Sequence, residues 1–291
     1  MIYTIENDYL KVDVETLGAQ LKSIYSKVEK TEYLWQGNPD YWAGRAYNLF
    51  PIVGRLFENK YTYGGKTYEM NPHGFSRRTE YTLTEKTDTE MAFCISSTDE
   101  TFKQYPFEFI LTVRYILTGN KLTVAFKVKN VGSGKMYFGL GGHPGFNIPF
   151  GGGNFEDYYV EFDGECKPRQ LTLSENYLLS GKTREFPLEN DRILRLKHEL
   201  FDDDAVILQG HTRSVKIKSG KTDRYVGVEF PRGKYLGIWH KPHSDAPFVC
   251  IEPWENLPSV DGKVEDLTEK DNIGVVEAGE SYNTFFAIEI K

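Results

Sequence analysis

The chain has 291 residues, of which 40% are hydrophobic and 26% are charged, a composition typical of soluble globular proteins. The formal net charge is −7, with no basic block, which argues against a nucleic-acid partner. No apolar run approaches the ~20 residues of a membrane-spanning helix, so we expect no membrane partner. Three cysteines without a CxxC pair suit a reducing compartment, and the acidic N-terminal segment lacks a signal peptide's apolar core, so we expect a cytoplasmic protein.

Alternation of apolar and polar residues with period two predicts β-strands along most of the chain. Residues 61–68 predict a tight hairpin around Gly64 and Gly65, and residues 107–117 and 122–128 predict a longer antiparallel hairpin around a Gly-Asn turn. Further short strands are predicted at residues 136–140, 158–162, 215–218, 225–230, 235–239, 248–251 and 284–290.

Helical periodicity is scarce, and only a turn or two is predicted, near residues 40–42 and 200–204. Many short strands separated by turns favour an all-β sandwich of mostly antiparallel strands over an alternating β/α fold. The chain contains no proline- or serine-rich linker, no charge block and no repeat of 20–50 residues. We therefore expect one domain over residues 1–291.

One histidine pair has the local spacing of metal ligands. His240 and His243 form an H-x-x-H motif, but no third ligand follows at a characteristic distance. We interpret this pair as part of a surface loop and predict no metal site. Nothing else in the sequence indicates a cofactor.

Four short segments place an ionisable group among glycine, proline and aromatic residues. Arg55 ends an apolar run, His73 lies between proline and glycine, His143 follows a predicted strand, and Glu252 ends another. Sites are often built where strands end on a rigid sheet. Because Glu252 is flanked by apolar residues, we expect partial desolvation to raise its pKa toward the range of a general base. A histidine, with an unperturbed pKa of about 6.5, can supply a proton at neutral pH.

The ordered motifs carry a family resemblance over essentially the whole chain. Pro-x-x-Gly-Arg, Pro-His-Gly-Phe, Gly-Gly-His-Pro-Gly-Phe-Asn, Phe-Asp-Asp-Asp-Ala and Cys-Ile-Glu-Pro-Trp occur in this order. This set resembles the aldose 1-epimerase family, and specifically its LacX-type branch. The resemblance implies a galactose mutarotase-like β-sandwich (a supersandwich) with an open sugar cleft, no cofactor, and interconversion of the α and β anomers of a hexose.

The resemblance also implies roles for individual residues. Glu252 resembles the catalytic base and His143 the catalytic acid, while His73 resembles the second active-site histidine, which positions the sugar and polarises its ring oxygen. Arg55 and Asp204 resemble ligands of the sugar hydroxyls. Asp202 and Asp203 adjoin Asp204, so a shift of one position would exchange them. Three aromatic residues are further candidates for a surface on which the sugar stacks: Trp239, Trp254 and Phe146.

Mutarotation needs one base and one acid, and we expect Glu252 and His143 to lie on opposite sides of the anomeric carbon. The chain departs from the galactose enzymes around both histidines, since it has Pro-His-Gly-Phe where they have Leu-His-Gly-Gly, and Pro-Gly-Phe-Asn after His143. These departures leave the identity of the sugar open.

Three alternatives stay open at this point. An enzyme with the same fold can act on a hexose 6-phosphate, with Arg77, Arg78 or Lys241 supplying positive charge near the phosphate. The protein can be a non-catalytic carbohydrate-binding sandwich. It can also be a glycoside hydrolase that uses Asp204 and Glu252 as its carboxylate pair, although two histidines are surplus to that mechanism. The sequence gives no firm signal for oligomeric state and leaves a homodimer open.

Overall fold

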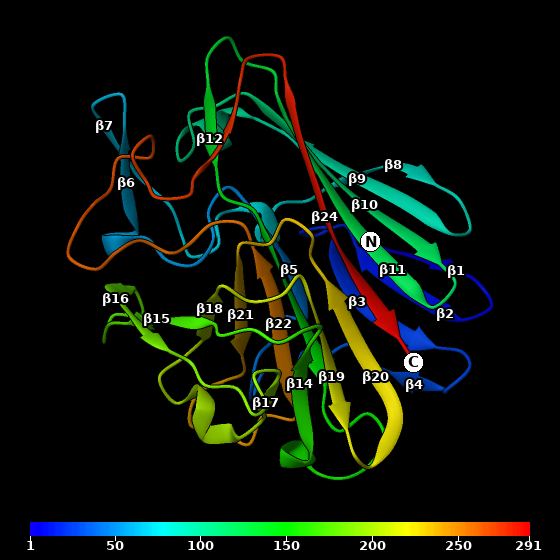
Figure 1. Ribbon diagram of the computed structural model, residues 1–291. Helices are drawn as coiled ribbons and strands as arrows, with labels where there is room; N and C mark the ends of the chain where they lie inside the picture. Colours follow the sequence, from blue (N-terminus) through cyan, green and yellow to red (C-terminus); the bar gives the residue numbers. More distant parts are fainter.

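The computed structural model describes residues 1–291, and antiparallel strands dominate it (Figure 1). The largest sheet has nine strands, and each bonds to its neighbours in an antiparallel register. Their spatial order is β17 (Ile193–Arg195), β14 (Tyr158–Phe162), β19 (Ser214–Ser219), β20 (Thr222–Glu229), β24 (Ser281–Ile290), β11 (Lys121–Asn130), β10 (Phe109–Thr118), β9 (Glu90–Ser96) and β8 (Thr82–Lys86).

A second sheet of seven strands carries most of the candidate site residues. Its spatial order is β16 (Leu179–Glu185), β15 (Arg169–Leu173), β18 (Val206–Gln209), β21 (Tyr235–Trp239), β22 (Phe248–Trp254), β13 (Gly141–Asn147) and β5 (Ala46–Leu49). Strand β22 is therefore paired on both edges, with β21 on one side and β13 on the other.

Three smaller sheets complete the strands. An N-terminal sheet holds β1 (Ile2–Glu6), β2 (Leu10–Glu15), β3 (Gln20–Ser26) and β4 (Thr31–Glu32). Two further sheets have two strands each: the hairpin of β6 (Lys60–Tyr63) and β7 (Lys66–Glu69), and the pair of β12 (Met136–Phe138) with β23 (Gly274–Val276), which are distant in sequence. The β6–β7 pair projects from the body of the molecule, and both termini lie near the N-terminal sheet (Figure 1).

Helical structure is limited to single turns. They are η1 (Phe57–Asn59), η2 (Ser76–Arg78), α1 (Asp99–Phe102), η3 (Phe155–Asp157) and η4 (His198–Phe201). No helix has the length and apolar character needed to cross a membrane. The structure confirms the turn expected near residues 200–204 as η4, and the turn expected near residues 40–42 is a hydrogen-bonded turn at residues 39–41.

Alternating burial explains why these segments form strands. In β10, the side chains of Phe109, Leu111, Val113 and Tyr115 are fully buried, while the residues between them are half-buried. The β10–β11 hairpin is paired from Phe109 with Asn130 to Thr118 with Lys121. The predicted all-β architecture and both predicted hairpins are therefore confirmed.

Two strands that carry candidate site residues differ from the prediction. Glu252 was expected at the end of a strand, but β22 continues two residues further, to Trp254. His143 was expected in a loop after a strand, but it lies within β13. Because β13 and β22 are each paired on both edges, their glycine and proline residues remain in the sheet. The sheet itself, and not a loop, therefore fixes the backbone of both residues.

Candidate active site

A cavity of about 320 Å³ lies over one face of the seven-stranded sheet. Four adjacent strands contribute to its walls: Tyr47 of β5, His143 of β13, Trp239 of β21 and Glu252 of β22. A larger groove, of about 700 Å³, lies on the nine-stranded sheet, but no histidine lines it. We therefore call the smaller space the site cavity and describe it from its residues upward.

His143 and Glu252 form the centre of the site cavity. Strands β13 and β22 pair Gly141 with Trp254 and Gly145 with Cys250, which puts His143 directly opposite Glu252. The imidazole Nε2 lies 3.3 Å from the carboxylate Oε2. The side chains of both residues are buried, with 7% of His143 and 1% of Glu252 exposed. The two groups are therefore neighbours on one wall, and the expected placement on opposite sides of a sugar is corrected to a side-by-side arrangement.

Burial shifts the pKa values of this pair in opposite directions. Desolvation raises the pKa of Glu252 well above its ordinary value, and the nearby carboxylate of Asp204 adds to the shift. Desolvation lowers the pKa of His143 to about 3, and the charge of Arg77 works in the same direction. Both shifts disfavour charge in an apolar setting. Between the lowered pKa of the imidazole and the raised pKa of the carboxyl group, the pair therefore holds one proton, and the two shifts favour a protonated carboxyl group beside a neutral imidazole.

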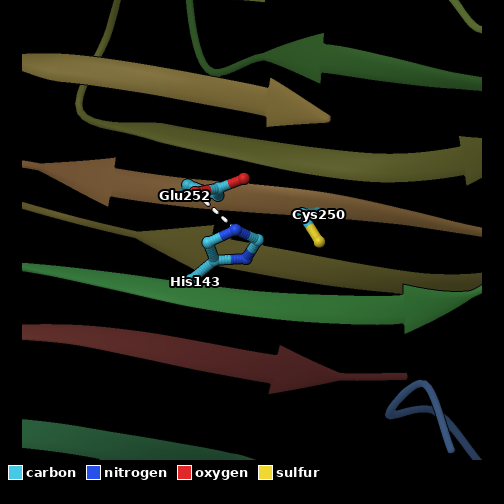
Figure 2. A group of neighbouring side chains, drawn as sticks. All are labelled: His143, Cys250 and Glu252. Atoms are coloured by element: carbon cyan, nitrogen blue, oxygen red, sulfur yellow. Dashed lines mark ion pairs between the residues drawn. The ribbon is translucent and has the colours of Figure 1, made fainter. Parts of the chain in front are cut away.

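Cys250 lies beside this pair on the same face of β22 (Figure 2). One donor atom from each of Cys250, His143 and Glu252 lies within 4.8 Å of the others, a donor set that metals accept. However, Cys250 is fully buried against Trp35 and Phe248 and does not line the site cavity. Burial raises the pKa of its thiol well above the usual value, whereas a metal ligand must be a thiolate. We therefore treat Cys250 as a packing residue.

His73 projects into the site cavity from the loop between β7 and η2. Its backbone has a positive φ of 64°, a conformation that is rare for residues other than glycine. The loop is held by two hydrogen bonds to one residue: the Gly54 N–H donates to His73 Nδ1 at 3.1 Å, and the His73 N–H donates to the Gly54 carbonyl at 2.7 Å. Because Nδ1 is an acceptor, the ring proton of the neutral imidazole is on Nε2. His73 is therefore a fixed hydrogen-bond donor.

The predicted hydroxyl ligands both line the site cavity. Arg55 follows Gly54, and its guanidinium lies over the ring of Tyr177 at 5.3 Å. Asp204 has a positive φ of 73°, and its Oδ1 accepts a 2.7 Å hydrogen bond from the indole N–H of Trp239. Backbone strain of this kind, in Asp204 and in His73, is often found at functional sites.

The choice among the three consecutive aspartates is settled by position. Asp204 lines the site cavity, whereas Asp202 accepts a hydrogen bond from the His243 backbone N–H at 3.1 Å and Asp203 is exposed to solvent. Of the three, only Asp204 is placed to meet a ligand in the cavity.

The three aromatic candidates have different positions. Trp239 and Trp254 line the site cavity, and Trp254 is 3% exposed. Phe146 is fully buried in the main hydrophobic core. Since successive side chains of a strand point to opposite faces, Phe146, three positions after His143, points away from the cavity. The prediction that Phe146 contacts the sugar is therefore wrong.

The surface-loop interpretation of His240 is also wrong. Its side chain is fully buried, and its Nε2 lies 3.1 Å from Nδ1 of His198, while its Nδ1 lies 2.7 Å from the Lys241 carbonyl. Because a carbonyl only accepts, His240 Nδ1 carries the proton and Nε2 accepts from His198. His243 is exposed and interacts with Asp202 instead. The two histidines of the H-x-x-H motif thus point to different surroundings.

Sequence reasoning missed several residues of the cavity wall. Trp42 stacks on the imidazole of His143, and Tyr47 and Tyr177 contribute two further rings. Arg77 also lines the cavity, whereas neither Arg78 nor Lys241 does. The pairing of β5 with β13, which aligns Tyr47 with His143, brings this segment to the site. A cluster of aromatics at residues 41–47 around Gly44 was the available signal.

Several polar atoms of the cavity are buried without a hydrogen-bond partner. They are Arg77 Nε, His143 Nδ1 and Trp254 Nε1. Buried polar atoms are nearly always paired in folded proteins. Their concentration around one cavity therefore suits a polar ligand rich in hydroxyl groups.

Comparisons with known proteins agree with this geometry. The family model described as aldose 1-epimerase matches residues 1–266. The chromosomal protein LacX of Lactococcus lactis subsp. lactis is 36% identical over 266 residues, which cover 88% of each chain. The structure of a galactose mutarotase related enzyme from Lactobacillus acidophilus superposes with a TM-score of 0.95 at 34% identity, covering 100% of this chain and 97% of the other. A galactose mutarotase-like protein from Lactobacillus casei ATCC 334 gives a TM-score of 0.95 at 30% identity, with both chains fully covered.

These matches confirm the galactose mutarotase-like β-sandwich that the motif order predicted. They also confirm the resemblance to the LacX-type branch. The chain belongs to the aldose 1-epimerase family.

Proposed function

We propose that this protein is an aldose 1-epimerase that interconverts the α and β anomers of an aldohexose by acid–base ring opening. The observation that supports the proposal most directly is the 3.3 Å approach of His143 Nε2 to Glu252 Oε2 on the wall of the site cavity. Ring opening removes a proton from the O1 hydroxyl and delivers one to the ring oxygen O5. Because both oxygens are bonded to C1, two neighbouring groups on one wall can serve both.

The single proton held by the pair is sufficient for the cycle. Transfer of this proton from Glu252 to His143 creates a carboxylate base and an imidazolium acid together. The carboxylate then takes the O1 proton while the imidazolium protonates O5, and the C1–O5 bond opens to the aldehyde. After rotation about C1–C2, the groups exchange roles and the ring closes to the other anomer. A positioned proton donor or acceptor contributes roughly 10²–10⁴-fold to such a step.

The remaining polar groups of the cavity are suited to hold the sugar. His73 offers an Nε2–H donor with a fixed tautomer, and Arg55 offers a guanidinium that lies over the ring of Tyr177 on the cavity wall. Asp204 is held by Trp239 with one carboxylate oxygen engaged. Donors and a carboxylate acceptor together match the alternating donors and acceptors of sugar hydroxyls.

Polarimetry of freshly dissolved α-glucose and α-galactose tests the proposal. We expect the purified protein to accelerate equilibration above the buffer rate with a saturable dependence on sugar concentration. Calorimetric titration with the same sugars provides the second measurement. Binding without any acceleration would favour a non-catalytic carbohydrate-binding protein and overturn the proposal.

A hexose 6-phosphate is a second candidate substrate, and one observation favours it. Arg55 and Arg77 both line the site cavity, and neither forms a salt bridge with a carboxylate. Two guanidinium groups are a common arrangement for phosphate recognition. Rates measured side by side on glucose and glucose 6-phosphate separate the two substrates, since a phosphate-specific enzyme has a kcat/KM at least tenfold higher for the phosphorylated sugar.

A further inference from the structure

The imidazole of His143 lacks the hydrogen bond that usually orients a catalytic histidine. Its Nε2 faces Glu252, while its Nδ1 is buried and forms no hydrogen bond with another residue. In most sites, a carbonyl or carboxylate on the second nitrogen fixes the tautomer and the plane of the ring. A different interaction must therefore hold this ring in place.

Aromatic rings surround the imidazole instead. The indole of Trp42 stacks on its face, with ring centroids 4.8 Å apart and planes 28° from parallel. Tyr47, Trp239 and His73 approach only with edges, at 6.0, 5.7 and 5.4 Å. Trp42 thus makes the only parallel contact among these rings, and this contact determines the plane in which the imidazole lies.

Trp42 is itself held firmly, although it lies in a segment without regular secondary structure. Its carbonyl accepts a 2.8 Å hydrogen bond from the indole N–H of Trp35, and its backbone N–H donates to the Asn38 carbonyl at 2.9 Å. Its indole also stacks on the ring of Phe248 with centroids 5.8 Å apart.

Two glycines leave room for this indole. A Cβ atom at Gly44 would lie 2.6 Å from Trp42 Cε2, and one at Gly145, on β13, would lie 3.1 Å from Trp42 Cζ3. Real Cβ atoms essentially never approach other atoms as closely as the first of these distances. The segment and the neighbouring strand are therefore both shaped around the side chain of Trp42.

We propose that Trp42 is a positioning residue for His143, which keeps Nε2 directed at the reacting oxygens and stabilises the imidazolium that forms during turnover. The proposal rests on the proposed function, because it assigns His143 the role of acid. The face of an indole is the best aromatic partner for a cation, and such contacts strengthen when they are shielded from water. This attraction opposes the burial that otherwise disfavours the charged ring.

The competing role for Trp42 is a platform on which the sugar stacks, and kinetics separate the two. Replacement by leucine keeps apolar bulk without a π-face, and replacement by phenylalanine keeps a weaker one. If Trp42 positions His143, kcat falls about tenfold in Trp42→Leu and about threefold in Trp42→Phe, while KM changes less than about threefold. If Trp42 is a sugar platform, KM rises and kcat stays within about twofold of the parent value, and the proposal is overturned.

A spectroscopic measurement keeps the test independent of the proposed activity. In ¹⁵N NMR spectra of histidine-labelled protein, the His143 signals are identified as those absent from the spectrum of the His143→Asn variant. We expect Trp42→Leu to shift both ring nitrogens or to broaden them through exchange between tautomers, while the signals of His198 and His240 stay unchanged. If the parent protein has no mutarotase activity, this measurement alone decides, and unchanged His143 signals in Trp42→Leu rule the positioning role out.

Discussion

His143 and Glu252 are cross-strand neighbours whose facing atoms, Nε2 and Oε2, lie 3.3 Å apart within the continuous sheet. The pair differs from an exposed histidine and carboxylate in the order in which its members lose protons. Burial moves the pKa of the carboxyl up and the pKa of the imidazole down. The active pair therefore holds one proton over a range bounded by the lowered imidazole pKa and the raised carboxyl pKa.

This order of titration predicts the pH dependence of mutarotation. As the pH falls through the lowered pKa of His143, the pair gains a second proton and loses its base. As the pH rises through the raised pKa of Glu252, the pair loses its last proton and its acid. Unperturbed groups would confine the active form to between about pH 4.5 and 6.5.

We expect kcat/KM, corrected for the buffer rate, to persist at neutral pH and to keep at least half of its maximum near pH 4, because the pKa of His143 is lowered to about 3. Circular dichroism at each pH verifies that the protein stays folded. A narrow optimum with limbs at the unperturbed pKa values would contradict the shared proton.

Removing either member of the pair should abolish most of the catalytic acceleration. Glu252→Gln retains the shape of the side chain but cannot take a proton, and His143→Asn retains a polar group without an acid of suitable pKa. We expect kcat to fall by about 10²–10⁴-fold in each, with KM within a few-fold of the parent value. Cys250→Ser, which changes a neighbouring residue on the same strand face, is the matched control and should keep most of the activity. Parent-like turnover in either catalytic variant would sink the assigned roles.

Local sequence patterns predict some residues of this site, whereas others are placed by contacts between distant segments. Alternation of apolar and polar residues predicts the strands of the sheets. The order of the motifs identifies three residues that line the site cavity: His73, His143 and Glu252. The position of Phe146 follows from the same alternation, because it is an odd number of residues from His143 and therefore faces the core. That error arose because proximity in sequence was taken as proximity in the site.

The other differences depend on long-range contacts that no local pattern carries. Trp42 reaches His143 only because β5 pairs with β13, about 95 residues later in the chain. His240 is buried among Phe155, Phe201 and Phe248, and its Nε2 is satisfied there by His198 of η4 at 3.1 Å. Sequence spacing alone cannot show pairings of this kind.

The indole N–H of Trp239 should contribute to sugar affinity by fixing Asp204. This bond is 2.7 Å long and occupies one carboxylate oxygen. Because Trp239→Phe leaves Asp204 without this donor, we expect a loss of about 1–3 kcal/mol of binding, seen as a roughly five- to 150-fold rise in KM with a smaller change in kcat. The double variant with Asp204→Asn should lose much less than the sum of the single losses. Additive losses would show that Trp239 acts on the sugar independently of Asp204.

Gly54 should be required for the geometry that holds Arg55 and His73. Its φ is +70°, and a Cβ atom there would lie 2.4 Å from Cγ of Pro258. Gly54→Ala therefore combines backbone strain with a steric clash, and we expect a loss of about 2–4 kcal/mol of unfolding free energy in urea titrations.

Gly65→Ala is the matched control, because Gly65 has a φ of +75° with no heavy atom within 4 Å of an added Cβ. The control isolates the cost of the left-handed backbone, about 1–2 kcal/mol. Since the clash also displaces the two site residues, KM should rise in Gly54→Ala and stay unchanged in Gly65→Ala. Equal losses of stability in the two variants would mean that Pro258 moves aside freely and that contact with Gly54 does not fix this side of the cavity.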